Sequence, residues 1–497
     1  MPEPVIASVT VSDRGRVAAQ AAFGLCVGID ALWLFVGPVD GWWRWGALAV
    51  VVAVHLACVG LLRRAADAVA PRTVLVVVAA LAAVAVALPP RASKDVFLYA
   101  MEGRLLGVHH VNPYTHAPVD FASDPMFLHV ARQWRTTIGA YGPAFQALAA
   151  LGSLGYGTSA LLGRLYFQVL AALALLGSVM VLQRRRVATW LLVLVGLAPA
   201  ALATVNEAHI DVLVAFGLLV GVVMVLDGRY RTAGLVLGLA VLFKVNAAPP
   251  AVGVVVALLL ARRWISARRT ALVTVVVVVA GYVAFGVVAA LGPLRQQSKS
   301  ISRGSVPAWL SMVSDRLGRA APAVATNPGL RSALAAATAA VALAALVHRW
   351  RWKPDVAEFA LAFGLIYILS ANYVLGWYPV ALLPLLGLVR PRLAAIGLAT
   401  VVGFEALYAV PAAALSKVPH SLAPARIAPF VALALLVLLV TTRPPTLGLQ
   451  PSNSVSPALP GDGKLEPHHR TAAGVALGPD PAAVALHDLA DDGQPQP

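Results

Sequence analysis

The stretch that decides the fold class is "TVLVVVAALAAVAVALPPRASKDVFLYAMEGRLL", residues 73–106. Its first part, from Val74 to Pro90, is an unbroken apolar run, close to the ~20 residues with which an α-helix crosses a bilayer. The second part changes character at once, because it carries Lys94, Asp95, Glu102 and Arg104. This order predicts a membrane-spanning helix followed by a polar segment at the membrane surface.

The composition extends this prediction to the whole chain. Of its 497 residues, 60% are hydrophobic and 12% are charged, against roughly 25% charged residues in soluble domains. Apolar runs near membrane-spanning length recur from residue 17 to residue 441. The first run is too long for the core of a signal peptide and lacks a clear cleavage site. We therefore predict an all-α polytopic membrane protein without a signal peptide.

The basic residues predict how the chain is oriented. The net charge is +16, but the basic residues form short clusters between apolar runs rather than one contiguous face, so the pattern does not indicate nucleic-acid binding. The clusters lie at 14–16, 63–72, 184–186, 229–231, 262–269, 349–353 and 390–392. Because positive loops stay in the cytoplasm, we expect these loops and both chain ends there, in the plasma membrane.

About 14 spans fit this alternation, in a single transmembrane domain over residues 1–441. We place them near 17–37, 45–62, 73–90, 159–182, 189–205, 211–226, 233–246, 248–261, 270–291, 330–347, 356–371, 376–389, 393–413 and 426–441. Two long external segments are expected, at about 91–140 and 292–328, and residues 143–154 are predicted to form a partial or tilted helix. Residues 442–497 are rich in Pro, Gly and Ser and then acidic, which predicts a disordered cytoplasmic tail.

Ionisable residues gather at the expected external ends of the spans. Asp95, Tyr99 and Glu102 are spaced by four and three residues, so they share one face of a short helix. This helix is either a functional element at the interface or an ordinary juxtamembrane helix with snorkelling charges. The following "NPYTHAP" is predicted to be a turn, because the residue before a proline disfavours helix.

Two further polar groups have more than one reading. "NEAHID", residues 206–211, is either a polar hairpin or a functional cluster; as a metal site it is weak, since no second cluster has ligand spacing. Lys244 in "LFKVNAAPP" is either a snorkelling anchor or a point charge for a phosphate. The two cysteines, Cys26 and Cys58, lie in apolar runs, and we expect neither a disulfide framework nor a cysteine metal site.

Five segments in this order together resemble the integral-membrane glycosyltransferases of the GT-C superfamily, most closely the actinobacterial polyprenol-phosphate-mannose-dependent alpha-1,6-mannosyltransferases of lipomannan assembly. The segments are residues 95–118, "WRTTIGAYGPAF" (134–145), "NEAHIDVLVAFGLLVG" (206–221), "LAVLFKVNAAPP" (239–250) and "ANYVLGWYPVALLPLL" (371–386). The resemblance covers about residues 90–390. The chain departs from the simplest plan by two additional spans before the acidic loop, and by "NEAHID" where a Gly-Ala-His-Asn-Asp-like string is expected, which leaves Glu207 unmatched.

The resemblance implies an inverting enzyme that moves mannose from polyprenyl-phosphate-mannose to a lipid-linked mannan acceptor at the outer membrane face, with Asp95 as general base. No cofactor or metal is implied, and no nucleotide-binding glycine loop is found. The expected partners are the lipid-linked donor and acceptor and membrane lipids, without nucleic acid. Residues expected to bind substrate are Tyr99, Glu102, Arg104, Asn112, Tyr114, Tyr141, His209, Asp211, Lys244, Arg303, Trp377 and Tyr378.

Three alternatives remain open from the sequence. An arabinofuranosyltransferase of the same class would share the lipid-phosphate strategy. A transporter or flippase of polyprenyl-linked sugars would be expected to contain repeated halves and mid-membrane charges, neither of which is evident. A structural partner without catalysis would leave Asp95 and "NEAHID" unexplained.

Overall fold

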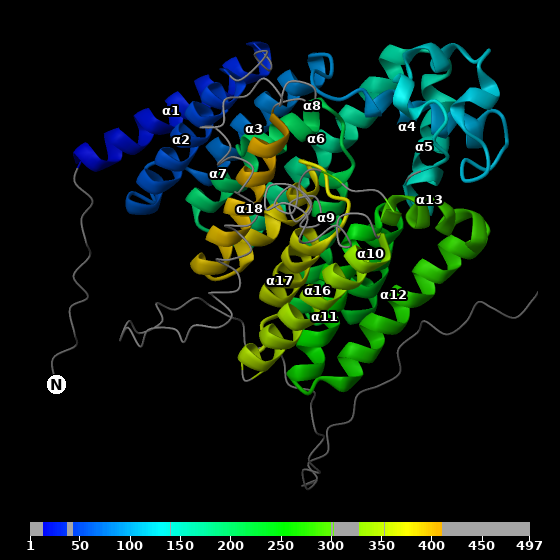
Figure 1. The fold of residues 1–497 in the computed structure, drawn as a ribbon. Helices are drawn as coiled ribbons and strands as arrows, with labels where there is room; N and C mark the ends of the chain where they lie inside the picture. Colours follow the sequence, from blue (N-terminus) through cyan, green and yellow to red (C-terminus); the bar gives the residue numbers. More distant parts are fainter. Residues whose placement is uncertain are drawn as a thin grey trace, which may run out of the picture. The chain divides into compact units, whose positions relative to one another are not determined.

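The computed structural model describes residues 13–36, 43–139, 141–299, 302, 328–351 and 353–409. The regular secondary structure of these residues is entirely helical (Figure 1), which confirms the all-α prediction for this part of the chain. The expected span at 426–441, the end of that at 393–413, most of the second external segment and the C-terminal tail lie outside the described residues.

The helices follow one another along the chain in an order that Figure 1 traces by colour. They are α1 (Asp13–Val36), α2 (Trp43–Arg64), α3 (Pro71–Ala87), α4 (Asp95–Gly107), η1 (Pro118–Phe121), η2 (Pro125–His129), η3 (Arg132–Trp134), α5 (Pro143–Tyr156), α6 (Ala160–Arg184), α7 (Thr189–Gly196), α8 (Pro199–Asn206), α9 (Asp211–Leu226), α10 (Tyr230–Phe243), η4 (Val245–Ala247), α11 (Ala248–Leu260), α12 (Trp264–Ala284), α13 (Val287–Lys299), α16 (Pro328–Trp350), α17 (Val356–Ser370), η5 (Tyr378–Leu388) and α18 (Pro391–Ala409).

Several of these helices have the length and composition of membrane spans. Among the described residues, five helices are long and apolar enough to cross a membrane, in α1, α2, α6, α12 and α18. The pair α7 and α8, bent by 41° at the break between them, is a sixth candidate. The chain is therefore a helical membrane protein, and the number of 14 spans stays a prediction.

The break between α7 and α8 corrects the single helix expected over residues 189–205. Pro199 is the first residue of α8, and Ala198 before it is extended with ψ 127°. A proline tolerates only a first-turn position and pushes its preceding residue out of the helical region. The apolar run is continuous in sequence, but the backbone is divided at this point.

The same rules divide the region around Lys244. This residue follows α10 with an extended backbone, φ −157° and ψ 129°. The short η4 turn comes next, and Pro249 and Pro250 occupy the first turn of α11, where they are tolerated. Lys244 thus lies at a helix break, where its side chain can point into a cavity rather than along a helix surface.

Helix α4 is more deeply buried than an interfacial helix. Ten of its 13 residues are buried, and it packs against α5 and α6. At Gly103, a Cβ atom would lie 2.3 Å from the Ala149 carbonyl oxygen, so the two helix backbones are in direct contact. The predicted helix at 95–105 and the predicted helix at 143–154 are both confirmed, and α4 is covered by α5 and α6; its position at the membrane interface stays a prediction.

Candidate active site

A cavity of about 190 Å³ opens beside the first residue of α4. Its wall comes from the start of α4, residues 134–142, the break at 244–246, helices α12 and α13, and residues 367–378. The charged side chains among its described lining residues are Asp95 and Lys244. The aromatic ones are Tyr114, Trp134, Tyr141, Tyr282, Tyr367, Tyr373 and Tyr378. The cavity therefore combines one carboxylate side chain and one lysine side chain with a largely aromatic wall.

Asp95 lies at the N-terminal end of a helix beside the cavity. It is the first residue of α4, at the positive end of the helix dipole. The residue is 5% exposed, and its Oδ1 accepts a 2.8 Å hydrogen bond from Trp134 Nε1. Its Oδ2 lies 4.0 Å from His209 Nδ1. One oxygen is thus held by the indole, while the other accepts no hydrogen bond from the described residues.

Lys244 lines the same cavity, and its side chain forms an ion pair with Asp211. Its Nζ lies 2.8 and 3.0 Å from the two carboxylate oxygens of Asp211, and 3.6 Å from the centre of the Tyr378 ring. The residue is 8% exposed. A snorkelling anchor would extend toward the surface, so the geometry favours an ammonium held inside the protein.

A chain of hydrogen bonds connects the cavity wall to the "NEAHID" segment. Tyr141 donates to the Tyr99 hydroxyl over 3.0 Å, and that hydroxyl lies 3.4 Å from His209 Nδ1. His209 Nε2 lies 2.9 Å from Glu207, and its ring stacks on Trp377 at 3.8 Å with a 10° angle. These partners assign the proton to Nε2 and leave Nδ1 to accept from Tyr99.

The three ionisable residues of "NEAHID" make two separate interactions, one within the segment and one with Lys244. Glu207 contacts His209, whereas Asp211 turns to Lys244 and also accepts a 3.3 Å hydrogen bond from Asn246. The intervening Ala208 has φ +57°, an uncommon conformation for a residue with a side chain, and it reverses the chain between α8 and α9. The segment reaches Asp95 through His209, and its carboxylates do not converge as metal ligands would.

Three of the predicted substrate-binding residues lie away from the cavity wall and hold the surrounding structure. Arg104 Nε donates to both oxygens of Asp124 at 2.9 Å. Glu102 accepts a 2.7 Å hydrogen bond from Gln146. Asn112 donates to the Phe285 carbonyl over 2.8 Å, which attaches the first external segment to the end of α12. Their contacts in this structure connect elements to one another.

Asp124 is the centre of the first of these contacts. Besides Arg104, its carboxylate contacts His109 Nε2 at 2.6 Å and accepts the Met126 N–H at 2.9 Å. Burial alone would raise the pKa of this carboxyl, but the hydrogen bonds from Arg104, His109 and Met126 outweigh burial and lower it below its usual value. Asp124 therefore stays ionised and fixes the loop that follows α4.

Of the remaining predicted residues, Tyr114, Tyr141 and Tyr378 line the cavity. Trp377 does not line it; this residue stacks on His209 and lines a second cavity together with Glu207. Arg303 lies outside the described residues. The loop that carries Tyr141 is fixed by Gly142, whose N–H donates to the Phe243 carbonyl and whose Cα approaches Leu242 so closely that a Cβ would lie 2.1 Å from its carbonyl oxygen.

Several residues of the cavity wall were not predicted from the sequence. Trp134, Asn246 and Tyr373 lie inside the segments that carry the family resemblance, so the resemblance itself held a signal for them. Tyr282 and Tyr367 come from the apolar helices α12 and α17. A tyrosine in such a run has no distinguishing pattern, and only the packing of the helices directs these two side chains to the cavity.

Residues 25–262 match the family model described as alpha-(1->6)-mannopyranosyltransferase, N-terminal domain. These residues belong to that family. Four of the five segments that carry the resemblance lie within the match, which confirms the relationship to GT-C mannosyltransferases. The match includes the second half of α1 and all of α2 and α3, so helices that precede the acidic segment lie within the family's own domain. No curated protein and no solved structure matches the chain.

The match over residues 25–262 supports a glycosyltransferase of the mannosyltransferase type, and the apolar helices support a membrane protein. The family description and the geometry are independent of each other. The family description gives the class of reaction, whereas the geometry gives a cavity lined by a carboxylate, a lysine and aromatic rings.

Proposed function

We propose that this protein transfers mannose from polyprenyl-phosphate-mannose to a lipid-linked mannan acceptor, with inversion, at the outer face of the plasma membrane. The product would be a glycan of the lipomannan or lipoarabinomannan type. The observation that carries the proposal is that Asp95 and Lys244 line one cavity within a chain whose N-terminal half belongs to a mannosyltransferase family.

Asp95 is the general base of this proposal. Its Oδ2 takes the proton of the acceptor hydroxyl as that oxygen attacks the anomeric carbon of mannose. The bond from the anomeric carbon to the phosphate oxygen breaks, and the lipid phosphate leaves with the electron pair. Because Trp134 holds Oδ1, the carboxylate keeps one orientation toward the cavity.

Lys244 supplies positive charge for the departing phosphate. An ammonium group has three N–H donors, and the two contacts to Asp211 are made by the same nitrogen. A phosphate oxygen that enters the cavity would share this nitrogen with Asp211, in a buried site where the attraction between charges is strong. The rings of Tyr141 and Tyr378 offer apolar faces for the sugar.

His209 acts as a positioning residue. Its stacking on Trp377 fixes the plane of the ring, and its hydrogen bond to Glu207 fixes the tautomer. The Nδ1 atom is then directed to Tyr99 and Asp95. This role gives Glu207 a function that the family's expected string did not predict.

The domain organisation is proposed together with the function. We assign residues 1–441 to one transmembrane glycosyltransferase domain, with residues 91–140 and 292–328 outside the cell and 442–497 as a cytoplasmic tail. In this arrangement the cavity opens to the outer leaflet, where a lipid-linked donor is within reach.

The test is a transfer assay with the purified protein and a short lipid-linked mannan acceptor. Radiolabelled polyprenyl-phosphate-mannose, polyprenyl-phosphate-arabinose and GDP-mannose are supplied in separate reactions. We expect label in the product only from the first donor, with an alpha linkage. Label from the arabinose donor alone would identify an arabinofuranosyltransferase, and use of GDP-mannose would overturn the proposal. Movement of the lipid-linked sugar across vesicle membranes without transfer would identify a flippase.

A further inference from the structure

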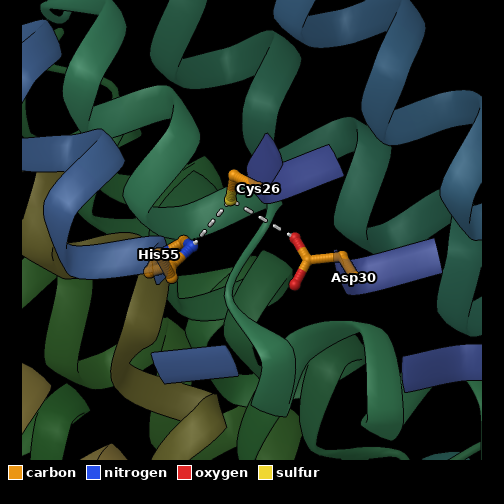
Figure 2. Close-up of side chains that lie close together, drawn as sticks. All are labelled: Cys26, Asp30 and His55. Carbon is orange, nitrogen blue, oxygen red and sulfur yellow. Dashed lines mark hydrogen bonds between the residues drawn. The ribbon is translucent and has the colours of Figure 1, made fainter. Parts of the chain in front are cut away.

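A second polar cluster lies in the N-terminal helix pair and contributes nothing to the cavity wall. Cys26 and Asp30 come from α1, one turn apart, and His55 comes from α2. Figure 2 shows the Cys26 sulfur between the His55 ring and the Asp30 carboxylate. The exposed fractions are 1%, 1% and 2%, so three polar side chains share one dry position between apolar helices.

The partners of Asp30 do not compensate for its burial. Among the described residues, its carboxylate has one side-chain hydrogen bond, from the Cys26 thiol at 3.6 Å. A thiol is a weak donor, and a buried carboxylate needs a cation or several strong donors. The described chain places no lysine or arginine in an ion pair with it. The cluster therefore has acceptor groups in excess of the positive charge around it.

The spacing of the ligand atoms fits a tetrahedral metal ion. Cys26 Sγ lies 3.6 Å from Asp30 Oδ2 and 3.7 Å from His55 Nδ1, and the three ligand atoms all lie within 4.8 Å of one another. Zn²⁺ binds sulfur at about 2.3 Å and nitrogen or oxygen at about 2.0–2.2 Å, and tetrahedral angles then separate the sulfur from the other ligands by about 3.6 Å. We propose that Cys26, Asp30 and His55 bind one Zn²⁺ ion between α1 and α2.

Charge balance supports this choice of ion and ligands. When Zn²⁺ binds, the Cys26 thiol releases its proton to solvent and coordinates as a thiolate. One thiolate, one carboxylate and one neutral imidazole then give the site a net charge of zero with the divalent ion. A metal site without net charge has the lower free energy between apolar helices, because an unpaired charge there is strongly destabilising.

Cys58 is a candidate for the fourth ligand. It lies on α2 three residues after His55, and its side chain is buried. If Cys58 joined as a second thiolate, each helix would offer two ligands one turn apart and the net charge of the site would become −1, so the electrically neutral site is the one with three protein ligands. The ion would fasten α1 to α2 and would have no part in sugar transfer, because no residue of the cluster lines the cavity. This proposal departs from the expectation that the cysteines form no metal site, because Cys26 and His55 are 29 residues apart and no ligand spacing in the sequence connects them.

The test measures metal in the full-length protein purified in detergent. Plasma emission spectrometry, after incubation with Zn²⁺ and removal of the excess, should find close to one zinc per chain. Cys26→Ser and Asp30→Asn should each lose at least tenfold of this zinc. The matched control is Asp67→Asn, which removes an exposed carboxylate outside the cluster and should keep the full amount.

A second measurement does not depend on how the variants fold. Replacement of zinc by Co²⁺ in the natural protein should give a sulfur-to-cobalt charge-transfer band, and a chelator should remove the band and lower the melting temperature until Zn²⁺ is restored. Zinc below a tenth of an equivalent together with no cobalt band would overturn the proposal. Equal zinc in Cys26→Ser and the natural protein would overturn it as well. Loss of zinc in Cys58→Ser would add Cys58 to the ligands, and full retention would leave the three-residue site.

Discussion

The carboxylate of Asp95 is the residue-scale feature on which the proposed chemistry depends. Asp95→Asn keeps an oxygen that accepts the Trp134 hydrogen bond, so the fold should be preserved, but an amide cannot take a proton. We expect the rate of transfer to fall by at least about a hundredfold, as is typical for a removed general base. The purified transfer assay measures this loss, and near-normal turnover would rule out Asp95 as the base.

Trp134 offers a milder control for the same assignment. Trp134→Phe retains an aromatic wall and removes only the hydrogen bond to Asp95 Oδ1. A hydrogen bond to a charged group contributes about 1.5–3 kcal/mol, so we expect a loss of roughly tenfold to a hundredfold in turnover. A loss greater than that of Asp95→Asn would contradict the assigned order of importance.

Lys244 and Asp211 have to be changed together to separate binding from stability. Lys244→Met alone leaves the buried Asp211 carboxylate without its ion-pair partner, which costs about 3–5 kcal/mol. The double variant Lys244→Met with Asp211→Asn removes both charges, so the melting temperature should recover while the KM for the lipid-phosphate donor stays raised. Full recovery of donor use in the double variant would exclude Lys244 as the phosphate contact.

At the scale of elements, the contact between Asp124 and Arg104 fixes the loop after α4. Asp124→Asn leaves Arg104, which is 5% exposed, without its carboxylate, and we expect a loss of about 3–5 kcal/mol in the free energy of unfolding. Because the folded pKa of Asp124 is lowered, its stabilisation is present above the unfolded pKa and is lost as the pH falls through the folded one. Melting curves should therefore differ by a constant amount from neutral pH down to about pH 4 and converge below it.

Gly142 controls the approach of the Tyr141 loop to the helix break at Lys244. Gly142→Ala would place a Cβ 2.1 Å from the Leu242 carbonyl oxygen, so the loop must move, at a cost of about 1–3 kcal/mol. We expect transfer to fall more than stability, since Tyr141 lines the cavity. Gly155→Ala is the control, because no atom lies within 4 Å of its added Cβ; a similar loss of activity in that variant would argue against a specific role for Gly142.

At the scale of the whole chain, the polar contacts near the helix ends fall into two groups, one on each expected side of the membrane. Arg185 pairs with Asp227, Arg390 with Glu358, and Arg263 donates to Tyr230. The residues of each contact lie in, or within a turn of, loops that the positive-inside pattern assigns to the cytoplasm. Asn112 and Asp95 make their contacts, to Phe285 and Trp134, within the other group. The packing is therefore consistent with the alternation expected from the basic residues.

The orientation of these groups is a testable prediction. A cysteine in place of Thr115, an exposed residue of the first external segment, should react with a membrane-impermeant thiol reagent on intact cells. A cysteine in place of the exposed Arg231 should react only after the membrane is opened. Both natural cysteines are buried, so their background should be low. The reverse labelling pattern would place the candidate active site in the cytoplasm.

The sequence by itself determined the helical membrane class, the existence of α4 and α5, and the choice of Asp95, His209, Asp211 and Lys244 as residues of interest. It could do so because apolar run length, proline position and isolated charges are local properties, and local properties act on a helix before it packs. The burial of a helix is not a local property. The residues of α4 suggested a helix with an exposed face, but Gly103 packs directly against α5 and most of the helix is buried within the protein.

Only the tertiary structure decided which of these side chains meet. Trp134 and Asp95 are 39 residues apart, and Lys244 and Asp211 are 33 apart, so no spacing rule connects them. The same holds for the proposed zinc ligands on α1 and α2. A distance between two side chains on different helices depends on how whole helices pack, which is the sum of many weak contacts and is not encoded near either residue.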